Sequence, residues 1–288
     1  MQFGVVILPD MRWRDSIVRW RRAEELGFTH VWTYDHLAWR GFRDEPWFTS
    51  IPLLTAAATA TSRIAIGTLV ASPNFRHPLP LAKDLIALDD ISQGRVIAGI
   101  GAGGGGWDAT MLGQQAWSNR ERAERFAEFV ELTELLLREP QVNWSGKYYT
   151  VDEARTYPGC VQRPRLPLAI AAGKTRSMRV AARFGEYWVT IGDYERGELE
   201  PDAGVALVQT QIEELEAACE EVGRDPTTLR RLVLTGPLIQ PALSSKDSFF
   251  DVVGRYEAAG VTDLVVHWPR QSPPYQADEK VFELIFGS

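Results

Sequence analysis

Short apolar runs recur along the chain, and each is followed by a stretch with helical periodicity. The runs lie near residues 2–8, 31–35, 64–70, 96–101, 167–172, 187–191, 231–235 and 262–267. Runs that are apolar throughout are typical of parallel strands buried on both faces. The helical stretches lie near 14–26, 51–60, 79–91, 119–138, 175–184, 203–222, 247–258 and 278–286. This strict alternation predicts a (β/α)8 TIM barrel in preference to an open doubly wound sheet.

Signals at the helix ends agree with this pattern. Ser118 and Glu121 stand at capping-box spacing, so the serine hydroxyl is expected to bond the first-turn amides. Gly27, Gly94 and Gly260 follow predicted helices where a left-handed residue usually ends a helix. These residues therefore mark the boundaries of the βα units.

One segment, 141–166, breaks the alternation. Residues 144–149 have the pattern of a small hairpin, and Pro158, Pro164 and Pro167 lead back to the fifth predicted strand. We interpret the segment as an insertion on the barrel rim. Residues 1–288 are therefore expected to form a single barrel domain.

Composition narrows the classes of function. The 288 residues are 45% hydrophobic and 24% charged, with a formal net charge of −7. An acidic balance argues against a nucleic-acid partner, which needs a basic face. No apolar run approaches the ~18 residues of a membrane span. The two cysteines, Cys160 and Cys219, form no metal or disulfide pattern. With no signal-peptide pattern at the N-terminus, we expect a cytoplasmic protein without a metal site.

Polar or glycine-rich residues follow the ends of three predicted strands. Asp35 and His36 follow the second, Gly101–Gly104 follow the fourth, and Gly173–Thr175 follow the fifth. The C-terminal ends of all strands in such a barrel form one rim, which carries the active site. We therefore expect the functional site on that rim.

The four histidines differ in their promise as functional groups. His36 can exchange a proton near neutral pH, although a rim histidine can also serve only to bind a neighbouring loop. His77 and His267 follow the third and eighth strands and are weaker candidates of the same kind. His30 begins a strand, on the opposite rim, and is expected to be structural.

The glycine-rich segments suit a bound anion or a flat ligand. Residues 99–104 match the spacing GxGxxG, but residues 105–108 are expected to continue as a loop, whereas the dinucleotide fingerprint needs a helix there. What remains for Gly101, Ala102, Gly103 and Gly104 is a close approach of backbone to ligand, or a loop without contacts. Thr175 could cap the next helix, whose free amides beside Gly173 and Lys174 would bind an anion; ordinary capping is the alternative.

Tryptophans gather in the predicted rim loops. They are Trp13, Trp39, Trp47, Trp107 and Trp268. Exposed tryptophans in loops are costly, so we expect some of them to wall an apolar pocket for a small-molecule substrate, although any one could pack against helices instead. The expected substrate pocket comprises Trp13, Trp39, Trp107 and His267.

Together these segments resemble the bacterial luciferase-like superfamily, specifically its oxidoreductases that use coenzyme F420 or FMN. The matching segments, in order, are 32–36, 66–73, 88–95, 99–103 and 171–173. The resemblance implies a (β/α)8 barrel, usually homodimeric, with the cofactor ring in the barrel mouth. It favours coenzyme F420, with FMN as the alternative, because the second strand ends in Asp-His and the third is followed by residues 72–76.

The resemblance also assigns expected roles to residues. Asp35 and His36 would lie beside the ring, with His36 catalytic and Asp35 orienting it. Leu69, Val70 and Ala71 would support the back of the ring, with a non-prolyl cis peptide bond between Leu69 and Val70. The Gly101–Gly104 and Gly173–Thr175 backbones would hold the phosphate-bearing tail.

The resemblance leaves the reaction open. The leading interpretation is an F420-dependent oxidoreductase that transfers a hydride. The alternatives are an FMN-dependent monooxygenase supplied by a separate reductase, and a non-catalytic flavin-binding protein. Gly104 stands where sugar-phosphate dehydrogenases of the group carry an acid, which disfavours their substrate. Leu8-Pro9-Asp10 replaces the His-x-His of metal-dependent barrel hydrolases, which disfavours that class.

Overall fold

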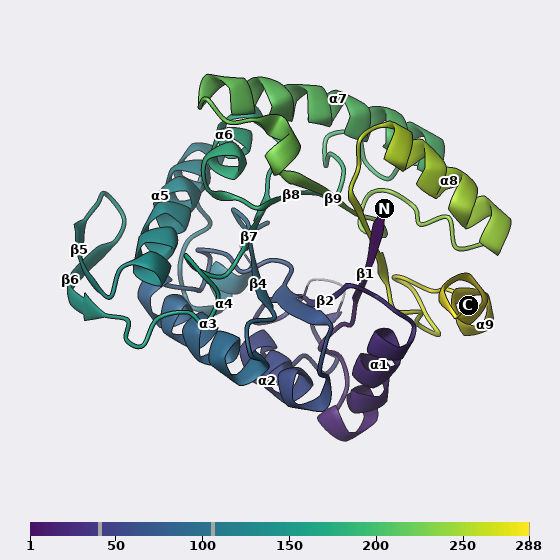
Figure 1. Ribbon diagram of the computed structural model, residues 1–288, viewed down its shortest axis with the longest axis horizontal. Coiled ribbons are helices and arrows are strands. Elements are labelled where there is room, and N and C mark those ends of the chain that lie inside the picture. The colour runs from purple at the N-terminus through teal and green to yellow at the C-terminus, as the bar shows by residue number, and fades with distance from the viewer. Residues whose placement is uncertain (40–41, 105–106, 288) are drawn as a thin grey trace.

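A closed barrel of parallel strands forms the centre of the molecule (Figure 1). The computed structural model describes residues 1–39, 42–104 and 107–287, so Gly105 and Gly106 lie outside the described residues. Around the barrel the strand order is β1-β10-β9-β8-β7-β4-β3-β2. The strands are β1 (Gln2–Val6), β2 (His30–Thr33), β3 (Ala65–Thr68), β4 (Val96–Ile100), β7 (Leu168–Ala171), β8 (Tyr187–Thr190), β9 (Arg230–Leu234) and β10 (Asp263–His267). The predicted (β/α)8 barrel is confirmed.

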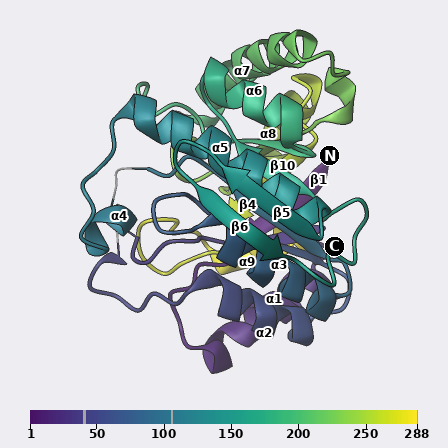
Figure 2. The same cartoon turned by 90° about the vertical axis from the view of Figure 1, so that its left-hand side faces the viewer.

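Helices surround the barrel on its outside (Figure 1). They are α1 (Trp13–Glu25), α2 (Ser50–Ala60), α3 (Pro78–Ser92), α5 (Asn119–Arg138), α6 (Thr175–Phe184), α7 (Pro201–Glu221), α8 (Lys246–Ala258) and α9 (Glu279–Phe286), with a 3₁₀ turn, η2 (Pro226–Thr228). The short helix α4 (Trp107–Met111) lies apart from this layer, in the segment between β4 and α5 (Figure 2). Within the described residues, no helix combines the length and apolar character needed to span a membrane.

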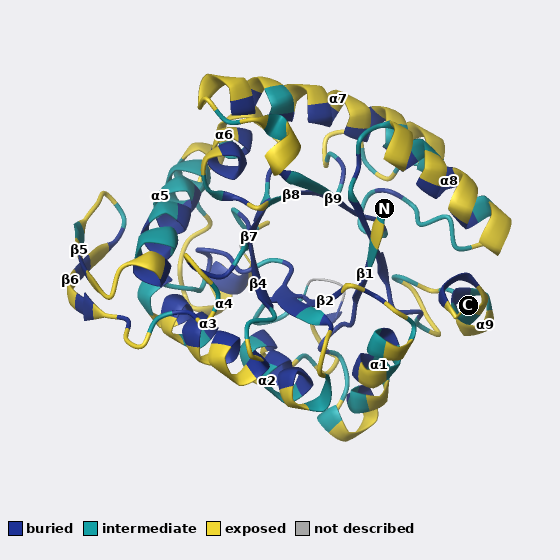
Figure 3. Cartoon of the chain, viewed as in Figure 1, coloured by how far each residue is buried: buried dark blue, intermediate teal, exposed yellow. Residues whose placement is uncertain are grey.

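Alternation along the strands divides the apolar residues into two layers. Val5 packs in the cluster between strands and helices, and its neighbour Val6 packs inside the barrel. Val31 and Trp32 divide in the same way. Successive side chains of a strand point to opposite faces, so a run that is apolar throughout fills both layers. Figure 3 shows that the barrel strands are largely buried and that the outward faces of the surrounding helices are exposed.

The helix ends mostly follow the sequence signals. Ser118 Oγ accepts from the Glu121 amide at 3.2 Å, and Gly94 ends α3 with a φ of 80°. Two expectations are wrong. Lys174, not Thr175, is the N-cap of α6, and the Ser177 hydroxyl bonds its backbone. Trp107, which was expected to lie in a loop, begins the one-turn helix α4. This helix makes tertiary contacts, described below, which a local sequence pattern does not reveal.

The segment after α5 forms the expected hairpin, from β5 (Gln141–Ser145) and β6 (Thr150–Arg155). It lies along the outside of α5, as Figures 1 and 2 show, and not on the rim. The Glu128 carboxylate on α5 accepts from the Tyr149 amide at 2.9 Å, and the buried Tyr149 ring packs against Phe129. The hairpin therefore covers part of the helical layer.

Candidate active site at the C-terminal rim of the barrel

Parallel pairing brings the expected site segments together. β2 pairs with β3, β3 with β4, and β4 with β7, all in parallel. The segments that follow these strands therefore leave the same end of the barrel side by side. They are Asp35–His36, Leu69–Ala71, Gly101–Gly104 and Gly173–Thr175. The Leu69–Val70 peptide bond is cis, as the resemblance implies.

His36 is held by a carboxylate that comes from a distant part of the chain. Its Nδ1 lies 2.8 Å from Oδ2 of Asp108, at the start of α4. Asp108 is 2% exposed, and its other oxygen accepts from the Leu37 amide at 2.7 Å. A carboxylate accepts, so Nδ1 carries a proton, and in the neutral form of the ring the lone pair is on Nε2. His36 is one-quarter exposed and can use Nε2 toward a bound molecule.

Asp108 was missed by sequence reasoning. The only signal in the sequence was that Asp108 is an acid a few residues after the glycines that follow the fourth strand. The resemblance gave Gly104 as the position where some family members carry an acid. The 72-residue separation between Asp108 and His36 hides their contact from any local pattern.

Asp35 does not orient His36, so that expectation is wrong. Its buried carboxylate accepts from Arg76 Nε at 3.0 Å, Arg76 Nη2 at 2.6 Å and the Ser50 hydroxyl at 2.5 Å. Neighbouring residues in an extended segment project to opposite sides. Asp35 therefore ties β2 to α2 and to the loop before α3, and its carboxylate makes no hydrogen bond to His36.

The first glycine segment packs tightly on the loop after β3. A Cβ on Gly101 would lie 2.5 Å from Val70 Cγ2, and one on Gly103 would lie 2.4 Å from Asn74 Nδ2. Gly103 also has a φ of 77°. Buried Asn74 donates to the Gly104 carbonyl at 3.2 Å and so braces the segment. The glycines leave backbone, not side chains, at this part of the rim.

We predict that Gly103→Ala costs about 1–3 kcal/mol, because a side chain strains a left-handed backbone and displaces Asn74. Gly113→Ala is the matched control, since Gly113 has a φ of 74° with open space around its Cβ position. Urea unfolding of both variants should show the larger loss at Gly103. Equal losses would contradict a bracing role for Asn74.

The second glycine segment opens α6. Gly173, Lys174 and Thr175 are exposed, and the first-turn amides of this helix point toward the rim end of the barrel. Such amides attract anions. Lys174 Nζ lies 3.1 Å from Glu195 and 3.4 Å from Asp193, so it is balanced by carboxylates in this state.

Aromatic rings form a cluster around the barrel mouth. Trp39 packs against Tyr34 and Tyr275, each with ring centroids 5.9 Å apart, and stacks on Trp47. Phe42 packs on Trp39 from the barrel interior. Of the five tryptophans expected in or beside the rim loops, the structure brings Trp39 and Trp47 into this cluster.

The other three tryptophans lie elsewhere. Trp13 and Trp268 pack against the core between strands and helices. Trp107 is 38% exposed and lies under the Arg43 guanidinium, which is 4.2 Å from the ring centroid. Trp13 therefore does not join the apolar wall of the mouth.

His267 is buried at the end of β10. Its Nδ1 lies 3.0 Å from the Thr235 carbonyl, and its Nε2 lies 2.8 Å from the Tyr34 hydroxyl. The ring stacks on Tyr275 at 3.6 Å. Burial lowers the pKa of His267 to about 3, so the ring is neutral at physiological pH.

This burial makes stability depend on pH. An unfolded histidine with a pKa of about 6.5 binds a proton before the folded His267 does. Stability therefore falls as the pH drops from about 6.5 toward 3, by about 2 kcal/mol at pH ~5. We predict that His267→Asn flattens this dependence by the same amount. Urea unfolding of both proteins at several pH values checks it; parallel curves would contradict it.

The remaining histidines have structural roles. His77 Nδ1 accepts from the Leu79 amide at 3.2 Å and caps α3, and its ring packs on Tyr149. His30 lies between Trp32 and Asp263 at the opposite end of the barrel. Across residues 1–39, 42–104 and 107–287, no group of three or more His, Cys, Asp or Glu is placed to hold a metal ion.

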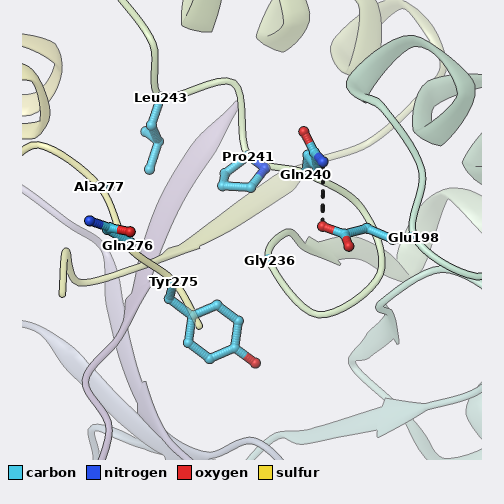
Figure 4. Close-up of a pocket in the computed structure, with 8 residues that line it drawn as sticks. All are labelled: Glu198, Gly236, Gln240, Pro241, Leu243, Tyr275, Gln276 and Ala277. Atoms are coloured by element: carbon cyan, nitrogen blue, oxygen red, sulfur yellow. Dashed lines mark hydrogen bonds between the residues drawn. The ribbon is translucent and has the colours of Figure 1, made fainter. Parts of the chain in front are cut away.

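A side pocket of about 310 Å³ adjoins the mouth (Figure 4). The Tyr275 ring forms one of its sides, and its hydroxyl points away from Leu243 and Ala277. Its lining residues are Glu198, Gly236, Gln240, Pro241, Leu243, Tyr275, Gln276 and Ala277. Glu198 accepts from Gln240 at 3.4 Å. Tyr275 thus lines this pocket and also packs against Trp39 of the aromatic cluster.

Residues 1–241 match the model of the luciferase-like monooxygenase family, and the chain belongs to that family.

Two relatives give the family context. The chain is 32% identical over 216 residues to an F420-dependent glucose-6-phosphate dehydrogenase of Amycolatopsis mediterranei, covering 73% of this chain and 63% of the relative. It is 30% identical over 236 residues to the F420-dependent hydroxymycolic acid dehydrogenase of Mycobacterium tuberculosis, covering 78% and 59%. The chain thus spans about three fifths of the length of these relatives.

A solved structure confirms the fold over the whole chain. An F420-dependent secondary alcohol dehydrogenase, in complex with an F420-acetone adduct, superposes with a TM-score of 0.80 at 18% identity. The match covers 99% of this chain and 98% of that one.

Proposed function

We propose that this chain is a coenzyme F420-dependent oxidoreductase, which transfers a hydride between the deazaflavin and a small organic substrate in the barrel mouth. The observation that carries the proposal is the His36–Asp108 pair at the rim, where a buried carboxylate fixes the protonated nitrogen. Relatives that are F420-dependent dehydrogenases support the choice of coenzyme.

The residues at the rim fit such a coenzyme. Half-buried Val70 and Ala171 pack on the interior cluster and offer an apolar wall to a flat ring. The Gly101–Gly104 segment presents backbone where any Cβ at Gly101 or Gly103 would collide. The exposed amides at the start of α6 suit the phosphate-bearing tail. The rim thus offers an apolar wall for a flat ring and exposed amides for an anionic tail.

The bound coenzyme would supply the hydride chemistry. The work of the chain is to handle the proton. Oxidation of an alcohol releases a proton from the hydroxyl, and His36 Nε2 holds the lone pair that takes it. Asp108 stabilises the ring as it becomes charged and keeps Nδ1 protonated. In the reductive direction the same nitrogen returns the proton.

The substrate is proposed by class only: a small molecule with a hydroxyl or carbonyl at the reacting carbon. Gly104 lacks the acid that marks sugar-phosphate dehydrogenases of the group. In this chain the nearest acid after the glycines, Asp108, is committed to His36 and the Leu37 amide.

A second candidate is an FMN-dependent monooxygenase supplied with reduced flavin by a separate reductase. It is favoured by the description of the family as luciferase-like monooxygenases. A third, a non-catalytic flavin-binding protein, would bind a cofactor without turnover. A homodimer, which the resemblance implies, is proposed for each of them and is checked by sedimentation equilibrium.

The test compares the cofactors directly. Purified protein is titrated with coenzyme F420 and with FMN, and the F420 complex is then given a panel of alcohols, with ketones for the reduced form. We expect tighter binding of F420 and a change in its absorbance with at least one substrate. Preference for FMN with oxygen consumption would favour the monooxygenase, and binding without turnover the non-catalytic protein.

A further inference from the structure

A chain of three side chains crosses the barrel mouth between the ends of β2, β9 and β10. Tyr275 Oη lies 3.2 Å from Tyr34 Oη, Tyr34 Oη lies 2.8 Å from His267 Nε2, and His267 Nδ1 lies 3.0 Å from the Thr235 carbonyl. Tyr34 and His267 are buried, and Tyr275 is half-buried at the open end. The proposed reaction of His36 does not use these groups.

The direction of each hydrogen bond between Tyr275 and Thr235 can be worked out from the buried end of the series, the Thr235 carbonyl. The Thr235 carbonyl can only accept, so His267 Nδ1 carries the ring proton. The ring is neutral, because burial lowers its pKa, and Nε2 is therefore an acceptor. Tyr34 must then donate to Nε2. Its single proton is used, so Tyr275 must donate to Tyr34.

The open end is therefore an acceptor. With its proton turned toward Tyr34, the Tyr275 oxygen offers only a lone pair to its surroundings. Tyr275 packs on Trp39 and on the apolar residues of the barrel interior, so this oxygen belongs to the mouth.

We propose that Tyr275 is a specificity-determining residue that accepts a hydrogen bond from a hydroxyl or N–H of the molecule bound in the mouth. Tyr34 and His267 are positioning residues, which set the direction of the Tyr275 proton. The proposal rests on the proposed function for the identity of that molecule. The donor belongs either to the substrate or to the coenzyme.

The hydrogen-bonded series Tyr275–Tyr34–His267 selects ligands but does not accept protons from them. If Tyr275 took a proton from a ligand, protons would have to move inward from Tyr275 to Tyr34 and from Tyr34 to His267. His267 would then become a buried cation, which the lowered pKa of His267 opposes. Proton transfer thus stays with His36, and the tyrosines distinguish an alcohol, which can donate, from its ketone, which cannot.

The first test determines the direction of these hydrogen bonds in the protein without any ligand. Nitrogen NMR of histidine-labelled protein should show His267 protonated at Nδ1 and bare at Nε2 around neutral pH. A proton on Nε2 would reverse the chain and overturn the proposal. This measurement is independent of which cofactor the protein uses.

The second test uses propan-2-ol and acetone as probes, and ligand-observed NMR to give their relative affinities with and without coenzyme F420. Tyr275→Phe should lower the preference for the alcohol by about 2- to 10-fold, the range for one neutral hydrogen bond. Tyr34→Phe frees the Tyr275 proton to point outward, so acetone should bind better than it does to the wild type. Tyr157→Phe, at an exposed tyrosine, is the control.

The same variants locate the donor. If Tyr275→Phe weakens coenzyme F420 alone by about 2- to 10-fold, the donor is on the coenzyme; if only the alcohol preference falls, it is on the substrate. Either result supports the proposal. Unchanged coenzyme affinity together with an unchanged alcohol preference overturns it. A wild-type protein that binds no F420 would reject the proposed function, while the NMR measurements would still decide this inference.

Discussion

Replacing His36 with alanine should lower turnover by about 10²- to 10⁴-fold and change coenzyme affinity much less. In the proposed complex Nε2 of His36 carries the lone pair that takes the proton, whereas backbone amides elsewhere would hold the coenzyme tail. Turnover of the best substrate in the panel and fluorescence titration of the coenzyme, both on the same variant, separate the two effects.

Asp108→Asn is the companion to that experiment. The amide keeps the shape of the carboxylate but no longer stabilises a charged ring, so turnover should fall and the pH profile should move with it. Wild-type turnover in His36→Ala would show that His36 only lines the pocket. A fall in His36→Ala without any change in Asp108→Asn would remove Asp108 from the mechanism.

Asp35→Ala should destabilise the fold by about 3–5 kcal/mol, because it removes the buried partner of the half-buried Arg76 guanidinium and leaves it only the longer ion-pair contact of 3.9 Å to Asp84. The side chains of Asp35 and Arg76 are 1% and 17% exposed, so water replaces little of the lost interaction. Urea unfolding measures the loss. We expect stability to change more than turnover, because both carboxylate oxygens of Asp35 are bound to Arg76 or Ser50 and not to the His36 ring.

A matched control comes from the surface. Asp202 pairs with Arg255 but is 77% exposed, and Asp202→Ala should cost no more than about 1 kcal/mol. Replacing Asp35 with leucine and Arg76 with methionine together should restore part of the stability lost in Asp35→Ala. A fully stable but inactive Asp35→Ala would return Asp35 to the catalytic role that the family resemblance implies.

The sequence by itself determined the barrel and the rim. The apolar runs specify strands buried on both faces, and the helical stretches between them leave few other arrangements. It also placed His36, Gly103 and Gly173 on one rim, because all parallel strands of a barrel end there. These features depend on local periodicity and on topology, which a sequence carries directly.

Only the tertiary structure decided the partners. Asp108 reaches His36, and Arg76 reaches Asp35, across separations of 72 and 41 residues. The chain from Tyr275 to Thr235 joins three strand ends in the same way. Such pairings depend on which way each side chain leaves its strand and on which loop packs against it. Periodicity constrains neither, so the sequence located the rim while packing chose the groups that act there.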